Sequence, residues 1–429
     1  MSMISNRNLL AGVAAVSLLA ATGAQAGGFA LREQSSTGMG AAFAGSAAGA
    51  AGLSSMFWNP ATMTNFAGLQ TSSSFSLILP YSNISPTAAT SPVLLGLGGA
   101  GSTGDIAQDA VVPASYASYQ ISDKVWVGIG INSPFGLVTQ NPNNWAGQIY
   151  GRTSKVFTVN ANPTVAYQVN DWLSIGAGVQ IQYFKVRLTQ ALSPAANAPS
   201  AELKGDDTAL GFTLGATLKP WAGGEIGIGY RSRVEPKLSG TLATPLGVTD
   251  IRSDLTLPDQ VTVGLRQKIT QDFTLLAGFE WTHWNLFTRF PVVNNAGVAV
   301  TTLPFDYRNS WFASLGGEYA WNQNLTVRAG LGFEKSPITN ETRSVRLPDS
   351  DRIWTTAGFT YKYNDKLSLD ASYAHLFAKS GTINVVAGNP AFLGADFVAN
   401  TKSHVDIVSV GFTYRWDNPK STRAIVAKY

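Results

Sequence analysis

The 429-residue chain contains no cysteine, and only 13% of its residues are charged. The absence of cysteine suits an exported protein that needs no disulfides, and it excludes a lipid-anchored cysteine at the mature N-terminus. The charged share is about half of that in an ordinary soluble domain. Beyond the N-terminal leader, no apolar run approaches the roughly 18 residues that a membrane-spanning helix needs. A chain of soluble domains and a helical membrane protein are therefore both disfavoured.

The charges that are present give no sign of a nucleic-acid partner. The formal net charge is only +4, and the basic residues are dispersed without forming a stripe. Aromatic residues, by contrast, make up 11% of the chain, and glycine is abundant at 43 residues. Low charge, many aromatics and no long apolar run are typical of a transmembrane β-barrel, in which only every second strand residue faces lipid.

The first 26 residues have the organisation of a cleavable secretory signal peptide. Arg7 precedes an apolar stretch over 9–21, which is followed by the small-residue pattern Ala24-Gln25-Ala26. The apolar stretch is too short to cross about 30 Å of hydrocarbon. We therefore expect a signal peptide over 1–26 and a mature chain that begins near Gly27.

Most of the remaining sequence divides into segments with period-two alternation, as β-strands require. One such file of apolar residues at every second position is Leu325, Val327, Ala329, Leu331 and Phe333. We predict fourteen strands, at 68–79, 112–121, 125–136, 153–168, 172–187, 206–218, 224–239, 256–268, 272–290, 305–320, 324–335, 352–363, 367–379 and 404–416. An even number places both ends of the barrel on the periplasmic side, as single-chain outer-membrane barrels require.

The connections between these segments alternate in length. Short ones, such as 122–124 and 322–324, resemble tight periplasmic turns. The long ones, expected to be extracellular loops, are 80–111, 137–152, 188–205, 336–351 and 380–403. A soluble β-sandwich also has alternating strands, but it does not explain the alternation of short and long connections. The predicted fold is thus all-β: a 14-stranded antiparallel transmembrane β-barrel over 68–416, followed by a polar C-terminal tail over 417–429.

Residues 27–67 do not alternate and are rich in glycine, alanine and serine. A flexible linker would explain that composition. It would not explain Phe29, Phe43 and Trp58, whose side chains need burial, and the barrel interior is the only place available before the first strand. We therefore expect an N-terminal hatch, or plug, in the lumen.

The hatch ends in a recognisable helix start formed by Asn59, Pro60 and Ala61. Asparagine is a favoured N-cap, and proline is favoured at the first helical position. We expect a short helical piece over 60–66.

Several short stretches, in this order along the chain, are similar to one known family: Gly28-Phe29-Ala30-Leu31, Ser35-Ser36-Thr37-Gly38-Met39-Gly40, Asn59-Pro60-Ala61, Pro134-Phe135-Gly136-Leu137, Gly229-Tyr230-Arg231-Ser232, Trp281-Thr282-His283-Trp284 and Leu347-Pro348-Asp349-Ser350-Asp351-Arg352-Ile353-Trp354. They resemble the FadL family of outer-membrane long-chain fatty-acid and hydrocarbon transporters, and the likeness extends along the whole mature chain. The resemblance implies a hatched 14-stranded barrel whose ligand is caught by extracellular loops, enters a lumen pocket and leaves through a gap in the wall. One departure is the end of the chain, because the family usually stops at the aromatic end of its last strand, here Trp416, whereas this chain continues to Tyr429.

The third predicted strand runs into Asn132, Ser133, Pro134, Phe135 and Gly136. Proline cannot donate a ladder hydrogen bond, and in a closed barrel an unmade bond faces lipid or a cavity. Either the chain bends inward here, or the strand ends and an extracellular loop begins. The family resemblance implies a kinked third strand with a lateral gap in this vicinity, so we favour a lateral opening at these five residues.

A fatty-acid carboxylate needs a cation, and arginine is favoured for its fork of donors. Arg308 and Arg352 lie at strand starts near the loop side, and the position of Arg308 resembles the family's pocket region. The alternative is that lumen arginines pair with lumen acids such as Glu280, Glu318 and Glu334. An uncharged hydrocarbon would need no cation at all.

The expected loops contain apolar clusters with no obvious core to join. These residues are Leu94, Leu95, Leu97, Phe392 and Leu393. Exposed apolar patches usually mark binding surfaces. They predict a site of first capture, although packing of loop against loop explains them equally well.

An enzyme is the second hypothesis, because some outer-membrane barrels are hydrolases. Only His283, His375 and His404 are available as bases, and no G-x-S-x-G elbow is present. A barrel lipase is therefore disfavoured, and we expect no catalytic residue, no metal site and no cofactor. A general porin is disfavoured by the bulky plug.

The sequence thus predicts an outer-membrane protein for passive uptake of long-chain fatty acids or similar hydrophobic compounds, with a channel for aromatic hydrocarbons as the alternative. The expected partners are the hydrophobic solute, outer-membrane lipids and the barrel-assembly machinery, without nucleic acid.

Overall fold

The structure, a computed structural model, describes residues 27–99 and 101–417. The predicted signal peptide and most of the predicted tail therefore lie outside the described residues. In the described part, no helix has the length and apolar character needed to cross a membrane.

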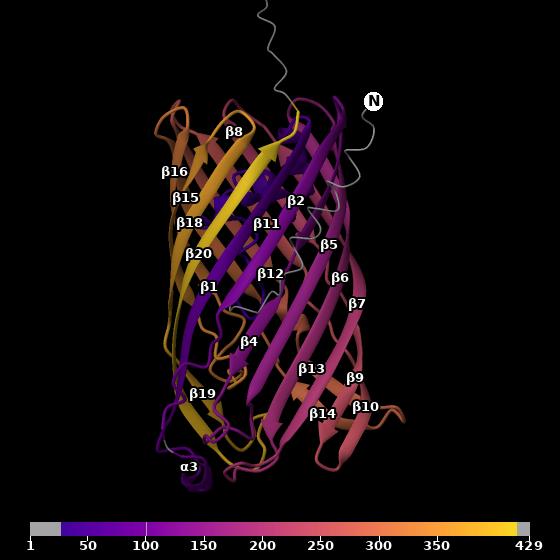
Figure 1. Ribbon diagram of the computed structural model, residues 1–429, viewed down its shortest axis with the longest axis vertical. Coiled ribbons are helices and arrows are strands. Elements are labelled where there is room, and N and C mark those ends of the chain that lie inside the picture. The colour runs from indigo at the N-terminus through magenta and orange to yellow at the C-terminus, as the bar shows by residue number, and fades with distance from the viewer. Residues whose placement is uncertain (1–26, 100, 418–429) are drawn as a thin grey trace, which may run out of the picture.

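The wall is a single antiparallel sheet that closes on itself (Figure 1). Its unbroken strands are β1 (Leu69–Pro86), β2 (Ala110–Ser122), β5 (Thr153–Gln168), β6 (Leu173–Ala191), β7 (Ser200–Leu218), β16 (Leu325–Lys335), β17 (Arg352–Lys362) and β20 (Phe397–Arg415). Six further wall segments are each broken in two: β3 (Val125–Asn132) with β4 (Gly136–Gln140), β8 (Gly224–Arg231) with β9 (Lys237–Thr244), β10 (Gly247–Asp254) with β11 (Gln260–Lys268), β12 (Phe273–Thr282) with β13 (Arg289–Asn294), β14 (Ala299–Pro304) with β15 (Ser310–Ala320), and β18 (Leu367–Ala378) with β19 (Gly381–Val385). Counted as wall segments, these strands confirm the predicted fourteen.

The barrel closes where β1 pairs with β20, from Gln70 opposite Arg415 to Pro86 opposite Ala399. After β20, Trp416 continues this contact, because its backbone N–H donates to the carbonyl of Leu69 at 3.0 Å. Closure leaves no long unpaired edge, which is what a strand-built membrane protein requires.

Alternation along each strand separates the two faces of the wall. On β6, Val179 and Ile181 are exposed on the outside, whereas Gln180 and Gln182 are buried in the lumen. The expected pattern of an apolar outer face and a more polar interior is therefore present.

The predicted strand ends were wrong on the side of the long connections. β1 runs on to Pro86, β6 reaches Ala191 and β7 begins at Ser200, so that the loop expected at 188–205 shrinks to 192–199. The loop expected at 380–403 contains β19 and the first residues of β20. The ladder continues beyond the lipid-facing band, where the outward residues turn from apolar to charged and the alternation used for prediction stops.

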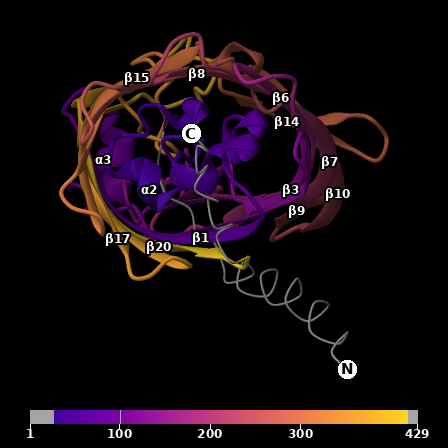
Figure 2. The same cartoon turned by 90° about the horizontal axis from the view of Figure 1, so that it is seen from above.

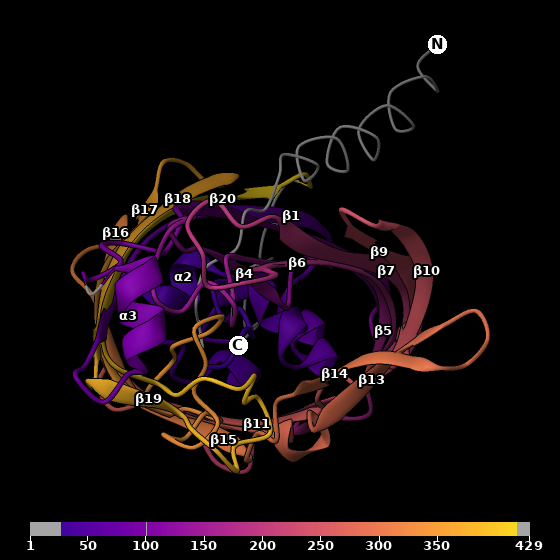
Figure 3. The same ribbon diagram turned by 90° about the horizontal axis from the view of Figure 1, so that it is seen from below.

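Proline accounts for several of the breaks, because it removes a ladder donor. Pro134 lies between β3 and β4, Pro236 between β8 and β9, and Pro258 between β10 and β11. On the loop side of these breaks the wall is looser. β10 and β13 pair at only two positions, and the β9–β10 and β13–β14 hairpins lean outward (Figures 1 and 3).

The hatch lies inside the barrel, as predicted. Views along the axis show the N-terminal segment, drawn in indigo, filling much of the lumen (Figure 2). It consists of short pieces, namely α2 (Ser36–Met39) and the 3₁₀ helices η1 (Ser46–Ala48), η2 (Gly52–Phe57) and η3 (Pro60–Asn65). The helix expected over 60–66 is therefore present, as a 3₁₀ helix rather than an α-helix. Two further helices lie in connections, α3 (Pro92–Gly98) and η4 (Trp284–Leu286).

Candidate ligand cavity and wall opening

An apolar cavity lies in the lumen, towards the end that carries the long connections, and the space between its lining residues is about 840 Å³ with the open solvent included. Its wall is built by inward-facing residues of several strands together with one hatch residue, Phe29. Among the apolar residues that line it are Leu137, Val156, Phe184, Val186, Leu188, Leu238, Val292 and Leu303. A concave site lined almost entirely by apolar side chains is typical of sites that bind apolar small molecules.

One side of the cavity is an aromatic cluster centred on Phe287. Its ring lies 4.8 Å from that of Phe290, 4.6 Å from that of Phe305 and 5.4 Å from that of Tyr307, measured between ring centroids. Phe29 of the hatch joins this cluster, 5.2 Å from Phe287. Such rings offer rigid apolar contact at little entropic cost.

Arg346 stands at the edge of this apolar cavity and has no ion pair within the described residues. Its guanidinium donates only to neutral acceptors, including the carbonyl of Thr189 at 3.2 Å and the side-chain oxygen of Gln190 at 2.7 Å. The loss of solvent lowers the pKa of the Arg346 guanidinium to about 10. It is still cationic at neutral pH, so it supplies one unneutralised positive charge to the cavity.

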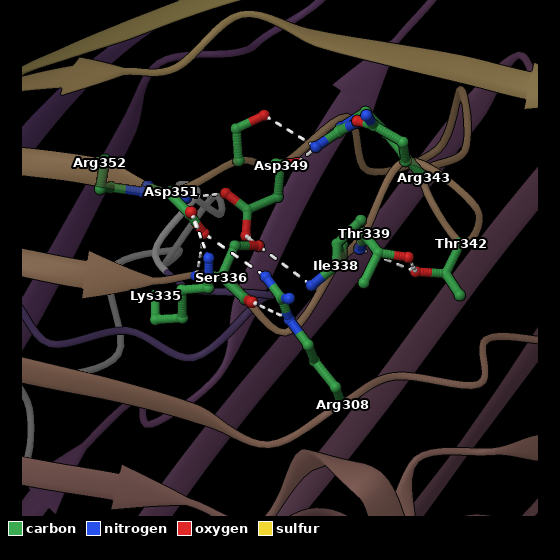
Figure 4. A network of polar contacts seen from close by, with 12 residues as sticks. Arg308, Lys335, Ser336, Ile338, Thr339, Thr342, Arg343, Asp349, Asp351 and Arg352 are labelled. Atoms are coloured by element: carbon green, nitrogen blue, oxygen red, sulfur yellow. Dashed lines mark hydrogen bonds and ion pairs between the residues drawn. The ribbon is translucent and has the colours of Figure 1, made fainter.

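The two arginines predicted to bind a carboxylate are placed differently (Figure 4). Arg352 is buried and forms ion pairs with Asp349 and with Glu334, the latter at 3.5 Å. Arg308 lies 3.6 Å from Asp351 and donates to the carbonyl of Ser336. Neither lines the apolar cavity, so the geometry favours the alternative in which these arginines hold acids of the protein.

Sequence reasoning missed Arg346 because its segment was assigned to an external loop. In the structure this loop folds inward, and both neighbours, Val345 and Leu347, are buried. Two apolar residues flanking a single arginine in an otherwise polar loop were the available signal.

The predicted opening at 132–136 coincides with a break in the wall. β3 ends at Asn132, the chain turns inward through Pro134 and Phe135, and β4 resumes at Gly136. The last ladder pair between β2 and β3 joins Ser115 to Ile131. In the described residues the next pairing on this side is the bridge between Ala107 and Thr139.

Hatch residues occupy this break. Ala30 forms an antiparallel bridge with Phe135. The N–H of Leu31 donates to the carbonyl of Pro134 at 2.8 Å, and the N–H of Gly136 donates to the carbonyl of Phe29 at 2.9 Å. The backbone groups that the wall leaves unpaired are thus satisfied by the hatch, as a buried ladder end requires.

Side chains of β5 and the hatch complete the contacts of the kink. Thr158 accepts the N–H of Phe135 and donates to its carbonyl. Gln34 donates to the carbonyl of Ser133 at 2.8 Å, and Asn160 donates to the side chain of Asn132 at 3.1 Å. The kink is therefore an ordered inward bend.

The hatch motif fixes the other end of the plug. The side chain of Asn59 accepts the N–H of Ala61, as the predicted N-cap should. Its amide also donates to the carbonyl of Ala47 at 2.7 Å and to that of Ala216, on β7, at 2.9 Å. Pro60 starts η3 as expected. This motif therefore ties the hatch both to itself and to the wall.

A buried ionic network holds the start of the hatch. Arg32 forms ion pairs of 2.7 Å with Glu280 on β12 and with Glu334 on β16. Glu334 also accepts the backbone N–H of Gly27 at 3.0 Å. The N–H of Gly28 donates to Asp349 at 2.9 Å. All three acids proposed from the sequence as arginine partners form such pairs. Glu280 and Glu334 pair with Arg32 of the hatch, and Glu318 pairs with Arg328 on β16 at 2.8 Å.

Some residues of the predicted capture patch are buried by loop packing, and others are exposed. Leu94 is fully buried in a cluster of loop residues, and Leu95 and Phe392 pack partly against it. Leu97 and Leu393 remain exposed. Loop packing thus accounts for Leu94, and only the last two residues are free to meet a solute.

The histidines considered as bases are oriented by carboxylates. His283 lies 3.0 Å from Asp259, and His375 lies 2.7 Å from Asp406. His404 stacks on Tyr81 on the outside of the barrel. Among the described residues, no group of three or more acidic or histidine side chains could hold a metal ion.

Comparison with known proteins places this geometry in context. The profile of the family described as outer membrane protein transport protein (OMPP1/FadL/TodX) matches residues 17–416. Outer membrane protein P1 of Haemophilus influenzae is 27% identical over 457 residues, covering 95% of this chain and 99% of that protein. The long-chain fatty acid transport protein of Escherichia coli K12 is 26% identical over 413 residues, covering 85% and 91%.

Solved structures share the fold. A Pseudomonas aeruginosa FadL homologue superposes with a TM-score of 0.83 at 23% identity, covering 91% of this chain and all of that one. The toluene transporter TodX of P. putida superposes with a TM-score of 0.64 at 16% identity, covering 86% and 95%.

Proposed function

Because the chain belongs to the OMPP1/FadL/TodX family of outer-membrane transport proteins, we propose that it carries long-chain fatty acids inward, through the apolar cavity and out through the wall at the β3–β4 kink. The observation that supports this most is that the apolar cavity has at its edge a cation, Arg346, which has no ion pair in the described residues. A long apolar chain with a single carboxylate matches both features.

A second cavity, about 630 Å³ with its open solvent included, offers a way in from the loop side. It is lined by residues such as Glu341, Arg343 and Pro390, and it shares Phe305 and Ser344 with the inner cavity. Its more polar lining suits a solute that is still partly hydrated. A fatty acid would pass Phe305 and leave its water behind.

The way out leads past the first hatch residues. Phe29 lines the cavity and lies 5.7 Å from Phe135 at the kink, ring to ring. The hatch segment 29–31 therefore stands between the cavity and the break in the wall. For a ligand to leave laterally, this segment has to move away from Pro134 and Gly136.

An uncharged aromatic hydrocarbon is the second candidate substrate. One relative in fold is named as a toluene transporter, and the aromatic cluster around Phe287 would suit such a solute. Arg346 would then have no ligand charge to meet, so this residue separates the two candidates.

The test is therefore Arg346→Gln, which removes the charge and keeps hydrogen-bonding capacity. Hydrogen bonds to charged groups contribute about 1.5–3 kcal/mol, so oleate should bind about tenfold more weakly or worse. Binding of oleyl alcohol, which has the same chain and no charge, should be unchanged. Affinity is measured on purified protein by displacement of a fluorescent fatty acid.

Arg308→Gln is the matched control, because Arg308 is held by Asp351 and does not line the cavity. It should leave both affinities unchanged. Oleate binding that survives Arg346→Gln but is lost in Arg308→Gln would contradict the proposal. Tight toluene binding with no measurable oleate binding would favour the hydrocarbon candidate.

A further inference from the structure

On the outside of the barrel, three neighbouring strands change character at the same height. The outward file of β5 is apolar from Tyr167 to Phe157, that of β6 from Leu173 to Tyr183, and that of β7 begins at Leu218 and includes Leu214 and Leu210. Ten residues rise roughly 33 Å along a strand, or roughly 25 Å along the axis of a barrel with strands tilted by about 40°. This is the height of the apolar band of an outer-membrane barrel.

Beyond these apolar residues the outward positions become charged, at once on β5 and β6 and after Thr208 on β7. We define the outer basic patch as Lys155 on β5, Lys185 and Arg187 on β6, and Lys204 on β7, together with the acids Glu202 and Asp206. The ladder places Lys155 opposite Arg187, Arg187 opposite Lys204, and Lys185 opposite Asp206. The six side chains therefore form one continuous surface directly above the lipid-facing band.

The acids of the patch leave part of its charge unneutralised. Glu202 forms ion pairs with both Arg187 and Lys204. Asp206 accepts a hydrogen bond from Tyr183 at 3.3 Å. Neither Lys155 nor Lys185 has an ion pair among the described residues. Two ammonium groups thus face outward without an ion pair in the described residues, and the patch as a whole has four basic and two acidic side chains.

The neighbouring outward surface beyond the lipid band carries equal numbers of positive and negative side chains. On the adjoining β9–β10 hairpin, Lys237 and Arg252 are matched by Asp250 and Asp254. The excess of positive charge on the β5–β7 face is therefore not shared by the hairpin beside it, and a surface made only for solvent would not require it.

We propose that the outer basic patch binds the phosphate groups of an anionic glycolipid in the outer leaflet of the membrane. Lysine and arginine at a membrane surface attract anionic headgroups, and arginine matches phosphate in geometry. The lipid is favoured over a soluble phosphate because the apolar residues of the lipid-facing band below the patch, among them Phe157 and Leu210, would contact its acyl chains. The inward neighbours of the same residues, among them Val156 and Val186, line the apolar cavity, so the bound lipid backs the wall of that cavity.

The test compares two triple variants of the full mature protein. Lys155→Gln/Lys185→Gln/Arg187→Gln removes three of the four positive charges of the patch. Lys124→Gln/Lys268→Gln/Lys366→Gln removes the same charge from the short turns at the opposite end of the barrel. Binding of fluorescent diphosphoryl lipid A is titrated by anisotropy, and heat-modifiable mobility on gels reports that each barrel is folded.

Wild type and the turn variant should bind equally, and the patch variant should bind about tenfold more weakly or worse. Removing both phosphates from the lipid should weaken binding to wild type by a similar factor. Equal binding by the patch variant would overturn the proposal, as would equal binding of the dephosphorylated lipid. Inorganic pyrophosphate that displaced the lipid at equal concentration would mean that the patch recognises free phosphate and not a membrane lipid.

Discussion

At the scale of single residues, Glu33 of the hatch is an ionisable side chain in an unusually unfavourable environment for a charge. It is buried, and neither of its carboxylate oxygens has a hydrogen-bond partner. The charged groups that interact with its carboxylate are Arg32, Glu334 and Arg352. Burial raises the pKa of the Glu33 carboxyl from 4.5 to about 7. While the hatch lies in the lumen, the protonated, neutral form of the Glu33 carboxyl is therefore favoured.

This predicts a pH-dependent stability with a defined sign. A carboxyl whose pKa is raised by folding stabilises the folded state fully below pH 4.5, and this contribution is lost as the pH rises towards about 7. Between about pH 5 and about pH 8 wild type should lose stability, and Glu33→Gln should lose much less. The midpoint of thermal unfolding, followed by tryptophan fluorescence, checks this. Equal losses in the two proteins would show that Glu33 does not carry the effect.

Residue roles were only partly predictable from sequence. The N-cap role of Asn59 follows from local chemistry and was confirmed. The roles of Arg308 and Arg346 depend on how loop residues fold back into the lumen, which strand parity does not specify. A strand position fixes whether a side chain faces lipid or lumen, but a loop position fixes neither.

At the scale of elements, the hatch fits into the lumen because the wall has glycine at positions on β8 that contact the hatch backbone. A Cβ atom added to Gly227 would lie 1.7 Å from the carbonyl oxygen of Ala47, and one added to Gly229 would lie 1.7 Å from that of Trp58. Both glycines are on β8, against the backbone of the hatch. The wall and the plug are therefore in backbone contact, with no room for a methyl group.

Gly229→Ala should consequently displace the hatch without breaking the barrel. Overpacking typically costs about 1–3 kcal/mol, and here moving the plug is the simplest relief. The expected result is leak of a small sugar from liposomes that wild type retains. Gly205→Ala is the control, because its nearest contact would be an ordinary 3.4 Å. Leak in both variants, or in neither, would contradict this account of the seat.

The positions of the strands could be predicted from the sequence, but some of their ends could not. Alternation located every wall segment, since each must show lipid on one face, but it failed at the loop-side ends where β6 and β7 continue as charged strands. For the kink, both alternatives contained part of the answer. β3 does end at Asn132, yet the chain returns to the wall as β4 instead of leaving as a loop.

At the scale of the whole molecule, closure was predictable because it follows from counting. Fourteen segments with alternating short and long connections can form a closed antiparallel barrel with both ends on one side. The lumen was not predictable in detail, because the cavity is enclosed by side chains from strands and hatch that are far apart in the sequence. Only the presence of a plug could be inferred, from aromatic residues in a segment that was not a strand.

The central claim is that a hydrophobic solute leaves through the wall at the β3–β4 kink once the hatch segment 29–31 moves. A disulfide between Ala30→Cys and Phe135→Cys tests it, because these residues are partners in an antiparallel bridge whose typical Cα separation of about 4.5–5.5 Å suits a disulfide. The natural chain has no cysteine to interfere. Ser73→Cys/Ser115→Cys is the control, since it joins two strands, β1 and β2, that are already paired.

The measurement is uptake of labelled oleate by cells that lack their own long-chain fatty acid transport protein, before and after mild reduction. The account predicts that the oxidised Ala30→Cys/Phe135→Cys protein takes up almost no oleate, that reduction restores uptake, and that the control transports equally in both states. Undiminished uptake with the Ala30–Phe135 bond formed would contradict the lateral route.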